Sequence, residues 1–246
     1  ASGYGMFVGG VMMGRLCFDP EDVVTKTTGG VVVLPKAHPL VSRRSRPAAA
    51  MERIGRSACD QCSYCTELCP RYLLGYDVQP HKVMRSLAFS VAGEALWNRS
   101  AEYCCACGLC TLYACPEELY PKEICDRAKA NMRTPGGRGT PPAPAAPHPM
   151  RAHRRVPLPR LRRRLNVEEY ERGAPFAAVD YYPLRTRIML CQHAGAPAIP
   201  SVSVGDRVAE GAPVGRAPLD KLGADVHASI GGKVVEVNST FIEIQA

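Results

Sequence analysis

The chain has 246 residues, of which 46% are apolar and 22% are charged, values that are typical of folded domains rather than disordered segments. Its formal net charge is +8, and its longest apolar runs are strand-sized, far short of the roughly 20 residues that a membrane-spanning helix needs. The sequence has no basic start with an apolar core and a small-residue cleavage site, so we expect a reducing, cytoplasmic compartment.

Residues 1–46 predict part of a β-domain. Short β-like runs alternate with glycine turns at Gly9-Gly10 and Gly29-Gly30, and the run from Val31 to Leu34 is closed by Pro35. These runs are too few for a whole domain, and the chain begins with Ala rather than Met. We therefore expect that an N-terminal portion of the protein precedes this sequence.

Residues 47–133 predict a helical domain. Pro80 opens a stretch in which apolar residues recur at helical spacing, and we expect this face to form a core: Val83, Met84, Leu87, Ala88, Val91, Ala95 and Leu96.

Eight of the twelve cysteines form two near-copies of one pattern within this helical domain. The chain reads Cys59-x2-Cys62-x2-Cys65-x3-Cys69-Pro70 and then Cys104-x2-Cys107-x2-Cys110-x4-Cys115-Pro116. Three cysteines at this spacing wrap a loop around a 4Fe-4S cubane, and the cysteine before Pro ligates the other cluster in two-cluster ferredoxins. We therefore predict two low-potential 4Fe-4S clusters, one held by Cys59, Cys62, Cys65 and Cys115, the other by Cys104, Cys107, Cys110 and Cys69.

Zinc and disulfides are the alternative uses of grouped cysteines. Structural zinc sites join two CxxC pairs across a spacer, whereas each group here has three closely spaced cysteines and a fourth before Pro. The pattern therefore favours clusters over zinc, and zinc over a disulfide framework.

Residues around the cysteines refine this prediction. Pro70 and Pro116 stand where we expect a loop to become a helix, because Pro is favoured at the first helical position. Gly108 has no Cβ, so the backbone can approach the cluster and direct amide N–H groups at sulfur. Cys105 would leave only one residue before Cys107, so we interpret it as a spare thiol.

Three cysteines lie outside the ligand spacing, and we expect them to be small buried hydrophobic residues: Cys17, Cys125 and Cys191.

Residues 134–160 predict an extended linker that is rich in proline and arginine. Seven arginines fall between residues 151 and 164. Such a run can bind nucleic acid or an anionic membrane, but it is more often a solvated linker or helix face, and no aromatic residues interleave it. We therefore expect no nucleic-acid partner.

Residues 176–246 return to a β pattern, with short strands separated by turn signals at Gly195, Gly205-Asp206, Gly211, Gly215, Gly223 and Gly231-Gly232.

The motifs resemble those of a known family. Cys59-Asp-Gln-Cys-Ser-Tyr-Cys-Thr-Glu-Leu-Cys-Pro70 and Cys104-Cys-Ala-Cys-Gly-Leu-Cys-Thr-Leu-Tyr-Ala-Cys-Pro-Glu-Glu-Leu119 are similar to the PduS-type cobalamin reductases of propanediol-utilisation microcompartments. Wider relatives are the RnfC-type electron-input subunits of ion-pumping complexes. Gly9-Gly-Val-Met-Met-Gly14 and Thr25-Lys-Thr-Thr-Gly-Gly30 resemble the end of a soluble-ligand-binding β-grasp (SLBB) domain. Gln192-His-Ala-Gly-Ala-Pro197 and Val226-His-Ala-Ser-Ile-Gly231 resemble a barrel-sandwich domain.

This resemblance implies an α+β multidomain fold. It divides the chain into a partial β-grasp domain (residues 1–46), an α-helical two-cluster ferredoxin-like domain (47–133), a linker (134–160) and a lipoyl-like barrel-sandwich hybrid domain (161–246).

The resemblance also implies a function. In the family, electrons pass from NADH through FMN and two clusters to a cobalamin or another acceptor. No glycine-rich loop in this chain follows a strand and opens a helix, so we expect FMN and NADH only in a preceding domain. Without that domain the chain is a relay that has no catalytic residue, and it is part of an oxidoreductase only together with it.

The expected partners follow from that function. They are a flavin/NADH module in cis or in trans, the cobalamin system or another redox protein as acceptor, and a microcompartment shell protein. The alternative is an RnfC-like subunit that is peripheral to the inner membrane.

The last domain supports a second hypothesis, a carrier or docking role. Lys221 follows Asp220 about where a lipoyl domain presents its Asp-Lys hairpin, but the residues after it depart from the carrier pattern, so we expect no modification. His193 and His227 could ligate a cobalt or iron centre, although histidines on a β-domain surface are more often structural.

Overall fold

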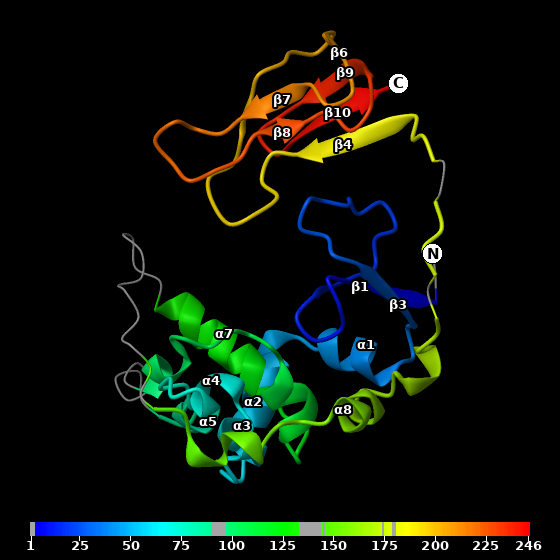
Figure 1. Cartoon of the computed structure of the whole chain (residues 1–246). Coiled ribbons are helices and arrows are strands. Elements are labelled where there is room, and N and C mark those ends of the chain that lie inside the picture. Colours follow the sequence, from blue (N-terminus) through cyan, green and yellow to red (C-terminus); the bar gives the residue numbers. More distant parts are fainter. Residues whose placement is uncertain (1–2, 90–96, 133–143, 145, 174, 179–180) are drawn as a thin grey trace. The chain divides into compact units, whose positions relative to one another are not determined.

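The computed structural model describes residues 3–89, 97–132, 144, 146–173, 175–178 and 181–246. The chain forms two compact units, which combine discontinuous segments (Figure 1). Unit 1 consists of Ala1–Leu16 and Val32–Arg172, and unit 2 consists of Cys17–Val31 and Gly173–Ala246. Among the described residues, no helix has the length and apolar character that crossing a bilayer requires.

Short helices, five of which begin with proline, make up most of the regular secondary structure in the described part of unit 1. Proline suits the first helical position because its missing N–H would have no partner there. The helices are α1 (Pro39–Arg44), α2 (Ala48–Ala58), α3 (Tyr64–Glu67), α4 (Pro70–Leu73), α5 (Pro80–Ser86), η1 (Arg99–Ala101), η2 (Cys110–Ala114), α7 (Pro121–Asn131), η3 (Pro149–Ala152), α8 (Leu158–Arg164) and η4 (Glu168–Tyr170).

The main core of unit 1 lies between α5 and α7. Val83, Met84 and Leu87 are buried as predicted, and they pack with Ile124 and Ala128 of α7. Burial of one such aliphatic side chain contributes about 1.5–3 kcal/mol.

The rest of the predicted apolar face does not extend this core. Ala88 is exposed, because the helix α5 ends at Ser86. Val91, Ala95 and Leu96 lie outside the described residues.

A three-stranded sheet in the order β2-β1-β3 lies at the start of the chain. Its strands are β1 (Tyr4–Val8), β2 (Arg15–Cys17) and β3 (Val31–Pro35). Phe7 and Leu34 of this sheet are fully buried and share a second core with Leu112 of η2 and Leu165 after α8. The sheet is thereby anchored to the segment that carries the second cysteine motif, while its identity as a β-grasp remnant stays a prediction.

The described part of the predicted linker differs from an extended chain. Residues 146–160 contain η3 and the start of α8, and the backbone N–H of His148 donates to the carbonyl of Leu73 at 3.1 Å. Arg154 also forms an ion pair with Glu67 of α3 at 3.4 Å. Proline composition predicted an extended segment, but these contacts give its backbone and the Arg154 side chain partners within unit 1.

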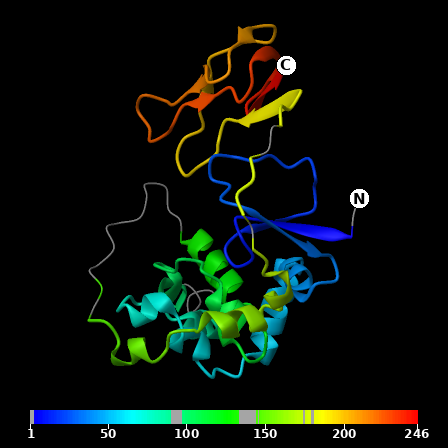
Figure 2. The same ribbon diagram turned by 45° about the vertical axis from the view of Figure 1, so that its right-hand side comes forward.

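Unit 2 consists of two antiparallel sheets, with strand orders β4-β10-β9-β6 and β5-β7-β8 (Figures 1 and 2). Ile242 of β10 pairs with Ile188 of β4 and with Val237 of β9. The strands are β4 (Arg185–Met189), β5 (Ile199–Pro200), β6 (Arg207–Val208), β7 (Pro213–Arg216), β8 (Val226–His227), β9 (Gly232–Val237) and β10 (Phe241–Gln245).

Apolar side chains from both sheets fill the interior of unit 2. The fully buried members of this core include Val214 and Val234 in addition to Ile242 and Ile244. Unit 2 is therefore built of antiparallel sheets, whereas unit 1 combines helices with the sheet β2-β1-β3, which confirms the predicted α+β multidomain class.

The segment from Cys17 to Val31 belongs to unit 2, although it lies within the range that we predicted as β-grasp. The backbone N–H of Lys26 donates to Gln192 Oε1 at 2.9 Å, and Lys26 Nζ donates to the carbonyl of Asp225 at 2.7 Å. The Thr27 hydroxyl donates to the Gln192 carbonyl at 2.9 Å. The bonds to Gln192 join the Thr25–Gly30 segment to the Gln192–Pro197 motif of the last domain.

Candidate iron–sulfur centres

The first three predicted ligands of cluster one lie together with Cys115 from the second motif. Cys65 is buried at the start of α3 and interacts electrostatically with Cys59, Cys62 and Cys115. Cys115 in turn interacts with Cys59. These interactions place Cys115 near the three closely spaced cysteines of the first motif.

The four predicted ligands of cluster two line a separate pocket. Cys69, Cys104, Cys107 and Cys110 all face this pocket, together with the neighbouring thiol of Cys105. Cys69 interacts with Cys104 and Cys110 across it. The exchange of one cysteine between the motifs stays a prediction, because Cys110 of the second group also interacts with Cys65 of the first.

The two cysteine loops share an unusual backbone conformation. Gln61 and Ser63 in the first loop have φ of 62° and 63°, and Ala106 and Gly108 at the equivalent positions of the second loop have φ of 54° and 80°. Left-handed φ is rare for residues other than glycine, so its recurrence at two matched positions indicates a required loop shape.

Gly108 occupies the tightest of these positions. A Cβ built there would lie 3.0 Å from the carbonyl oxygen of Met12. Because Gly108 has no side chain, the cysteine loop can approach the backbone that follows β1. For the same reason the residue adopts its left-handed φ without strain.

A turn of π-helix accommodates the extra residue of the second motif. In η2 the N–H of Cys115 donates to the carbonyl of Cys110, five residues earlier, at 3.1 Å. Cys115 then has φ of −77° and ψ of 117°, close to the −69° and 120° of Cys69. The four-residue gap therefore leaves the fourth cysteine in the same conformation as the three-residue gap does, and π-turns of this kind are frequent at functional sites.

The two prolines after the motifs behave differently. Pro70 begins α4 as predicted, but Pro116 does not begin a helix, so that prediction is wrong. The backbone turns at Glu118, whose φ is 51°, and the next helix starts only at Pro121. A left-handed residue cannot continue a right-handed helix, so the next helix begins only after Glu118.

Backbone amides surround the cysteine sulfurs, as we expected of cluster ligands. The N–H of Ala106 donates to Cys104 Sγ at 3.3 Å, and the N–H of Leu119 donates to Cys115 Sγ at 3.3 Å. Gln61 adds its side-chain amide, which donates to Cys59 Sγ at 3.1 Å. Such bonds stabilise negative charge on ligand sulfur and adjust the reduction potential of a bound cluster.

Burial keeps most of these thiols protonated when they have no metal partner. Burial raises the pKa of Cys65 to about 12 and that of Cys69 to about 11, and it raises the pKa of Cys110 well above its ordinary value. A cationic iron centre reverses this preference, because thiolates are its ligands. The buried sulfurs therefore fit an iron–sulfur cluster, whose cationic irons would stabilise them as thiolates.

Among the described residues, no three His, Cys, Asp or Glu side chains form a group that could hold a single metal ion.

Cys105 lies in the second pocket beside the predicted ligands. A hydrogen bond from the Cys107 thiol, with help from Arg71, lowers the pKa of Cys105 to about 5, and the same contact raises the pKa of Cys107. Its role as a spare thiol stays a prediction, because both Cys104 and Cys105 line the pocket.

The cysteines without ligand spacing have three different environments. Cys125 of α7 is fully buried in the main core, as predicted, and a hydrogen bond from its thiol lowers the pKa of Cys104 to about 7. Spacing alone gave no signal of this contact. Cys17 is half-buried and Cys191 is exposed, so the expectation of burial is wrong for Cys191, which lies in a loop after β4.

The candidate residues of unit 2 lie on its surface. Lys221 is exposed in the turn between β7 and β8. His193 Nδ1 lies 3.1 Å from the carbonyl of Ala194, and His227 is exposed on β8. Within the described residues, these side chains join no metal-binding group.

Comparisons with known proteins agree with this organisation. Residues 58–120 match the 4Fe-4S dicluster domain family, and residues 175–246 match the RnfC barrel sandwich hybrid domain family. The chain is 37% identical over 240 residues to the cobalamin reductase PduS of Salmonella typhimurium strain LT2 and 36% identical over the same length to that of Citrobacter freundii. Each alignment covers 98% of this chain and 53% of the relative, so the chain spans about half the length of the curated relatives it matches. These similarities confirm the resemblance that the cysteine motifs indicated, and they support iron–sulfur clusters and a barrel-sandwich domain.

Proposed function

From the premise that this chain is a homologue of the PduS-type cobalamin reductases over about half of their length, we propose that it relays electrons. Two 4Fe-4S clusters pass single electrons from a flavin to an acceptor. Cys59, Cys62, Cys65 and Cys115 hold the first cluster, and Cys104, Cys107, Cys110 and Cys69 hold the second.

The exchange of one cysteine between the motifs carries this proposal. The electrostatic interactions of Cys115 with Cys59 and of Cys69 with Cys104 support this assignment of two four-thiol groups. Because each cluster then depends on both loops, the two cofactors are held at a fixed separation, as a relay requires.

The protein contributes ligation, hydrogen bonding and charge, while the clusters supply the one-electron chemistry. Amide groups donate to the sulfurs of Cys59, Cys104 and Cys115. Lys129 Nζ donates to the carbonyl of Cys104 at 2.7 Å, so a cation lies beside the second loop. Both features favour the reduced, more negative state of a bound cluster and raise its potential.

The electron donor in this proposal is a flavin/NADH module, in cis or in trans, that carries FMN. The acceptor is a cobalamin or its enzyme system, and the cellular setting is the cytoplasm or a bacterial microcompartment, where a shell protein is a further partner. The name of the curated relatives, cobalamin reductase PduS, supports this choice of acceptor.

An RnfC-type subunit at the inner membrane is the second candidate. The match of residues 175–246 to the RnfC barrel sandwich hybrid domain favours it. The two candidates differ in acceptor, because only the first predicts oxidation of the reduced clusters by cob(III)alamin.

An anaerobic titration tests the relay. Reconstituted chain should hold about eight iron and eight acid-labile sulfide atoms, and dithionite should bleach its visible absorbance, which cob(III)alamin should then restore. NADH alone should not bleach it, because a hydride donor needs a flavin to divide its electron pair. Stoichiometric zinc in place of iron, or rapid bleaching by NADH without flavin, would refute the proposal.

A further inference from the structure

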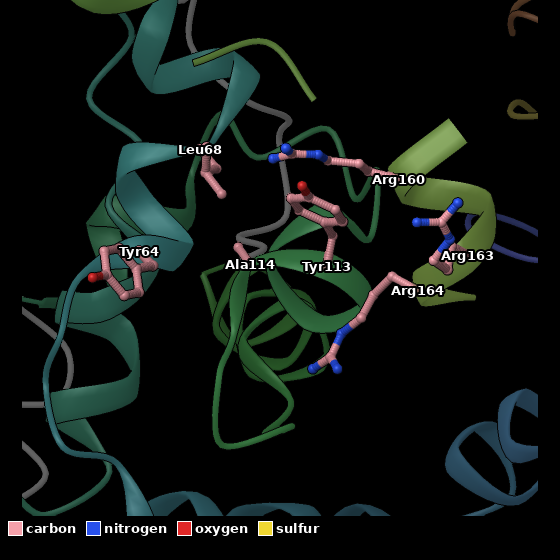
Figure 3. A pocket seen from close by; sticks show the side chains of 7 residues that line it. All are labelled: Tyr64, Leu68, Tyr113, Ala114, Arg160, Arg163 and Arg164. Atoms are coloured by element: carbon pink, nitrogen blue, oxygen red, sulfur yellow. The ribbon is translucent and has the colours of Figure 1, made fainter. Parts of the chain in front are cut away.

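The hydroxyl group of Thr66 lies between two groups that can accept its proton. Thr66 belongs to α3 and is only 4% exposed, whereas Tyr64 and Leu68 of the same segment line a surface groove beside the arginines of α8 (Figure 3). Thr66 Oγ1 lies 2.7 Å from Nδ1 of His81 on α5. Burial raises the pKa of the neighbouring Cys65, and a hydrogen bond from the Thr66 side chain acts in the opposite direction. One hydroxyl proton therefore has two acceptors, a ring nitrogen and a candidate ligand sulfur.

The same hydroxyl also caps the start of α5. The first residue of this helix is Pro80, and the side chain of the preceding residue, Gln79, makes no capping bond. Instead the backbone N–H of His81 donates to Thr66 Oγ1 at 3.2 Å, so a first-turn N–H that lacks an intrahelical acceptor gains a partner from another helix. A hydroxyl group has two lone pairs and one proton. The capping bond occupies one lone pair, and the proton stays available to either His81 or Cys65.

The charge of His81 decides which acceptor receives that proton. A neutral ring that carries its own proton on Nε2 accepts the Thr66 hydroxyl proton at Nδ1. A cationic ring instead donates from Nδ1 to Thr66 Oγ1, which leaves the hydroxyl proton free to donate to Cys65 Sγ. Burial lowers the pKa of His81, and the nearby charges of Lys82 and Arg85 lower it further, so the ring is neutral at neutral pH.

Few other charges influence His81. The elements that pack most closely against α5 are α2, α3, α7 and η1. Among the described residues of these elements, no charged group acts on the pKa of His81, and Lys82 and Arg85 of α5 itself are the two that do. The acidic residue of α3, Glu67, forms an ion pair with Arg154 at 3.4 Å. Negative charge added beside Cys65 is therefore the change to which the ring responds.

We propose that the arrival of an electron at the centre held by Cys65 is coupled to the uptake of a proton by His81, through the Thr66 hydroxyl. This coupling rests on the proposed electron relay and adds proton transfer to it. The electron comes from the donor, and the proton comes from solvent and binds Nδ1 of the partly exposed ring. The new N–H donates to Thr66 Oγ1, and the O–H bond of Thr66 turns from Nδ1 toward Cys65 Sγ. The only new covalent bond is that N–H.

The coupling has a defined sign. Hydrogen bonds to ligand sulfur favour the reduced state of a bound cluster, because it is the more negative state. The cationic ring and the redirected hydroxyl therefore both raise the reduction potential of the centre beside Cys65. By linkage, reduction raises the pKa of His81, so the potential should be constant in alkaline solution and should rise as pH falls through the pKa of the ring.

Four variants separate proton coupling from helix capping. His81→Gln removes the titratable ring and keeps the backbone N–H that Thr66 caps. Thr66→Val removes the hydroxyl, whereas Thr66→Ser keeps both the hydroxyl and the capping bond. His153→Gln is the matched control, because His153 is an exposed histidine of unit 1 that follows η3.

A redox titration of the reconstituted 246-residue chain, followed by electron paramagnetic resonance, tests the proposal. It should extend from about pH 5 to about pH 8, the range in which histidine titrates. One of the two cluster potentials should rise by about 59 mV in total on acidification, which corresponds to about tenfold tighter proton binding in the reduced state. A factor of about ten is what one hydrogen bond to a charged group contributes.

The variants should divide into two classes. His81→Gln should abolish the rise in potential, and Thr66→Val should abolish most of it. Thr66→Ser and His153→Gln should show the same rise as the wild type, because each keeps both the His81 ring and the hydroxyl.

Iron content and circular dichroism of each variant show whether both clusters are in place. A wild-type chain that binds no iron would refute the electron relay itself. Two intact clusters whose potentials do not change with pH, or a rise that persists in His81→Gln, would overturn the proton coupling and leave the relay standing. If Thr66→Val loses iron because α5 is no longer capped, the comparison of His81→Gln with His153→Gln still decides.

Discussion

Replacement of Cys69 with alanine should remove the second cluster and spare the first. Cys69 is 8% exposed and faces the pocket that Cys104, Cys107 and Cys110 line. The substitution leaves the start of α4 intact, because Pro70 keeps its place and the N–H of Leu73 donates to the backbone carbonyl of residue 69 at 3.0 Å. The effect should therefore fall on ligation rather than on the fold.

The expected magnitude follows from the four-thiol groups. Iron per chain should fall from about eight to about four atoms, because a cubane that loses one of four thiolates assembles poorly. Electron paramagnetic resonance of the dithionite-reduced protein should then show one cluster signal, without the spin coupling between two neighbouring reduced clusters.

Two variants complete the design. Cys115→Ala should remove the other signal, and Cys17→Ala, which changes a half-buried cysteine outside both motifs, should leave all the iron in place. A Cys69→Ala protein that lost the cluster of Cys59, Cys62 and Cys65 while retaining the other would refute the exchange of ligands.

Three further predictions concern the rest of the chain. Intact-mass analysis after expression in a lipoylating host should show no added group at Lys221, and a shift mapped to that residue would contradict the expectation. Glu243→Gln should destabilise unit 2 by about 2 kcal/mol in denaturant unfolding, because the 3% exposed carboxylate forms ion pairs with Arg185 and Arg187. An unchanged denaturation midpoint would show that these ion pairs do not stabilise the unit. Gly55→Leu should destabilise unit 1 by about 1–3 kcal/mol, because a Cβ added there would already lie 3.0 Å from Met84 Cε. Gly55→Ala should change stability by less than about 1 kcal/mol, because the flexible end of Met84 can move and alanine favours the helix.

The sequence predicted well the features that depend on local pattern. Val83, Met84 and Leu87 recur at helical spacing and are buried in one core, because a helix repeats every 3.6 residues wherever it lies. The same reasoning failed for Pro116, since its position after a cysteine resembles that of Pro70 but the left-handed Glu118 ends the turn. Local pattern does not encode that difference.

Spacing also left open how the longer second motif keeps its shape. The π-turn from Cys110 to Cys115 absorbs the extra residue, and its hydrogen bond becomes visible only when backbone coordinates are known. The contact between the Cys125 thiol and Cys104 was similarly hidden, because Cys125 lies on α7 at a distance in sequence that no ligand spacing marks.

The sequence by itself determined the chemistry of this protein. Two repeated cysteine motifs predict iron–sulfur clusters because ligand type and spacing are properties of a short stretch of chain. Tertiary structure alone decided which residues meet from distant segments, as when Arg160 on α8 comes to line a groove with Tyr64 and Tyr113. The physical reason is that burial and hydrogen bonding pair residues that the folded chain brings together, and composition predicted only a solvated linker or helix face for the segment that carries Arg160.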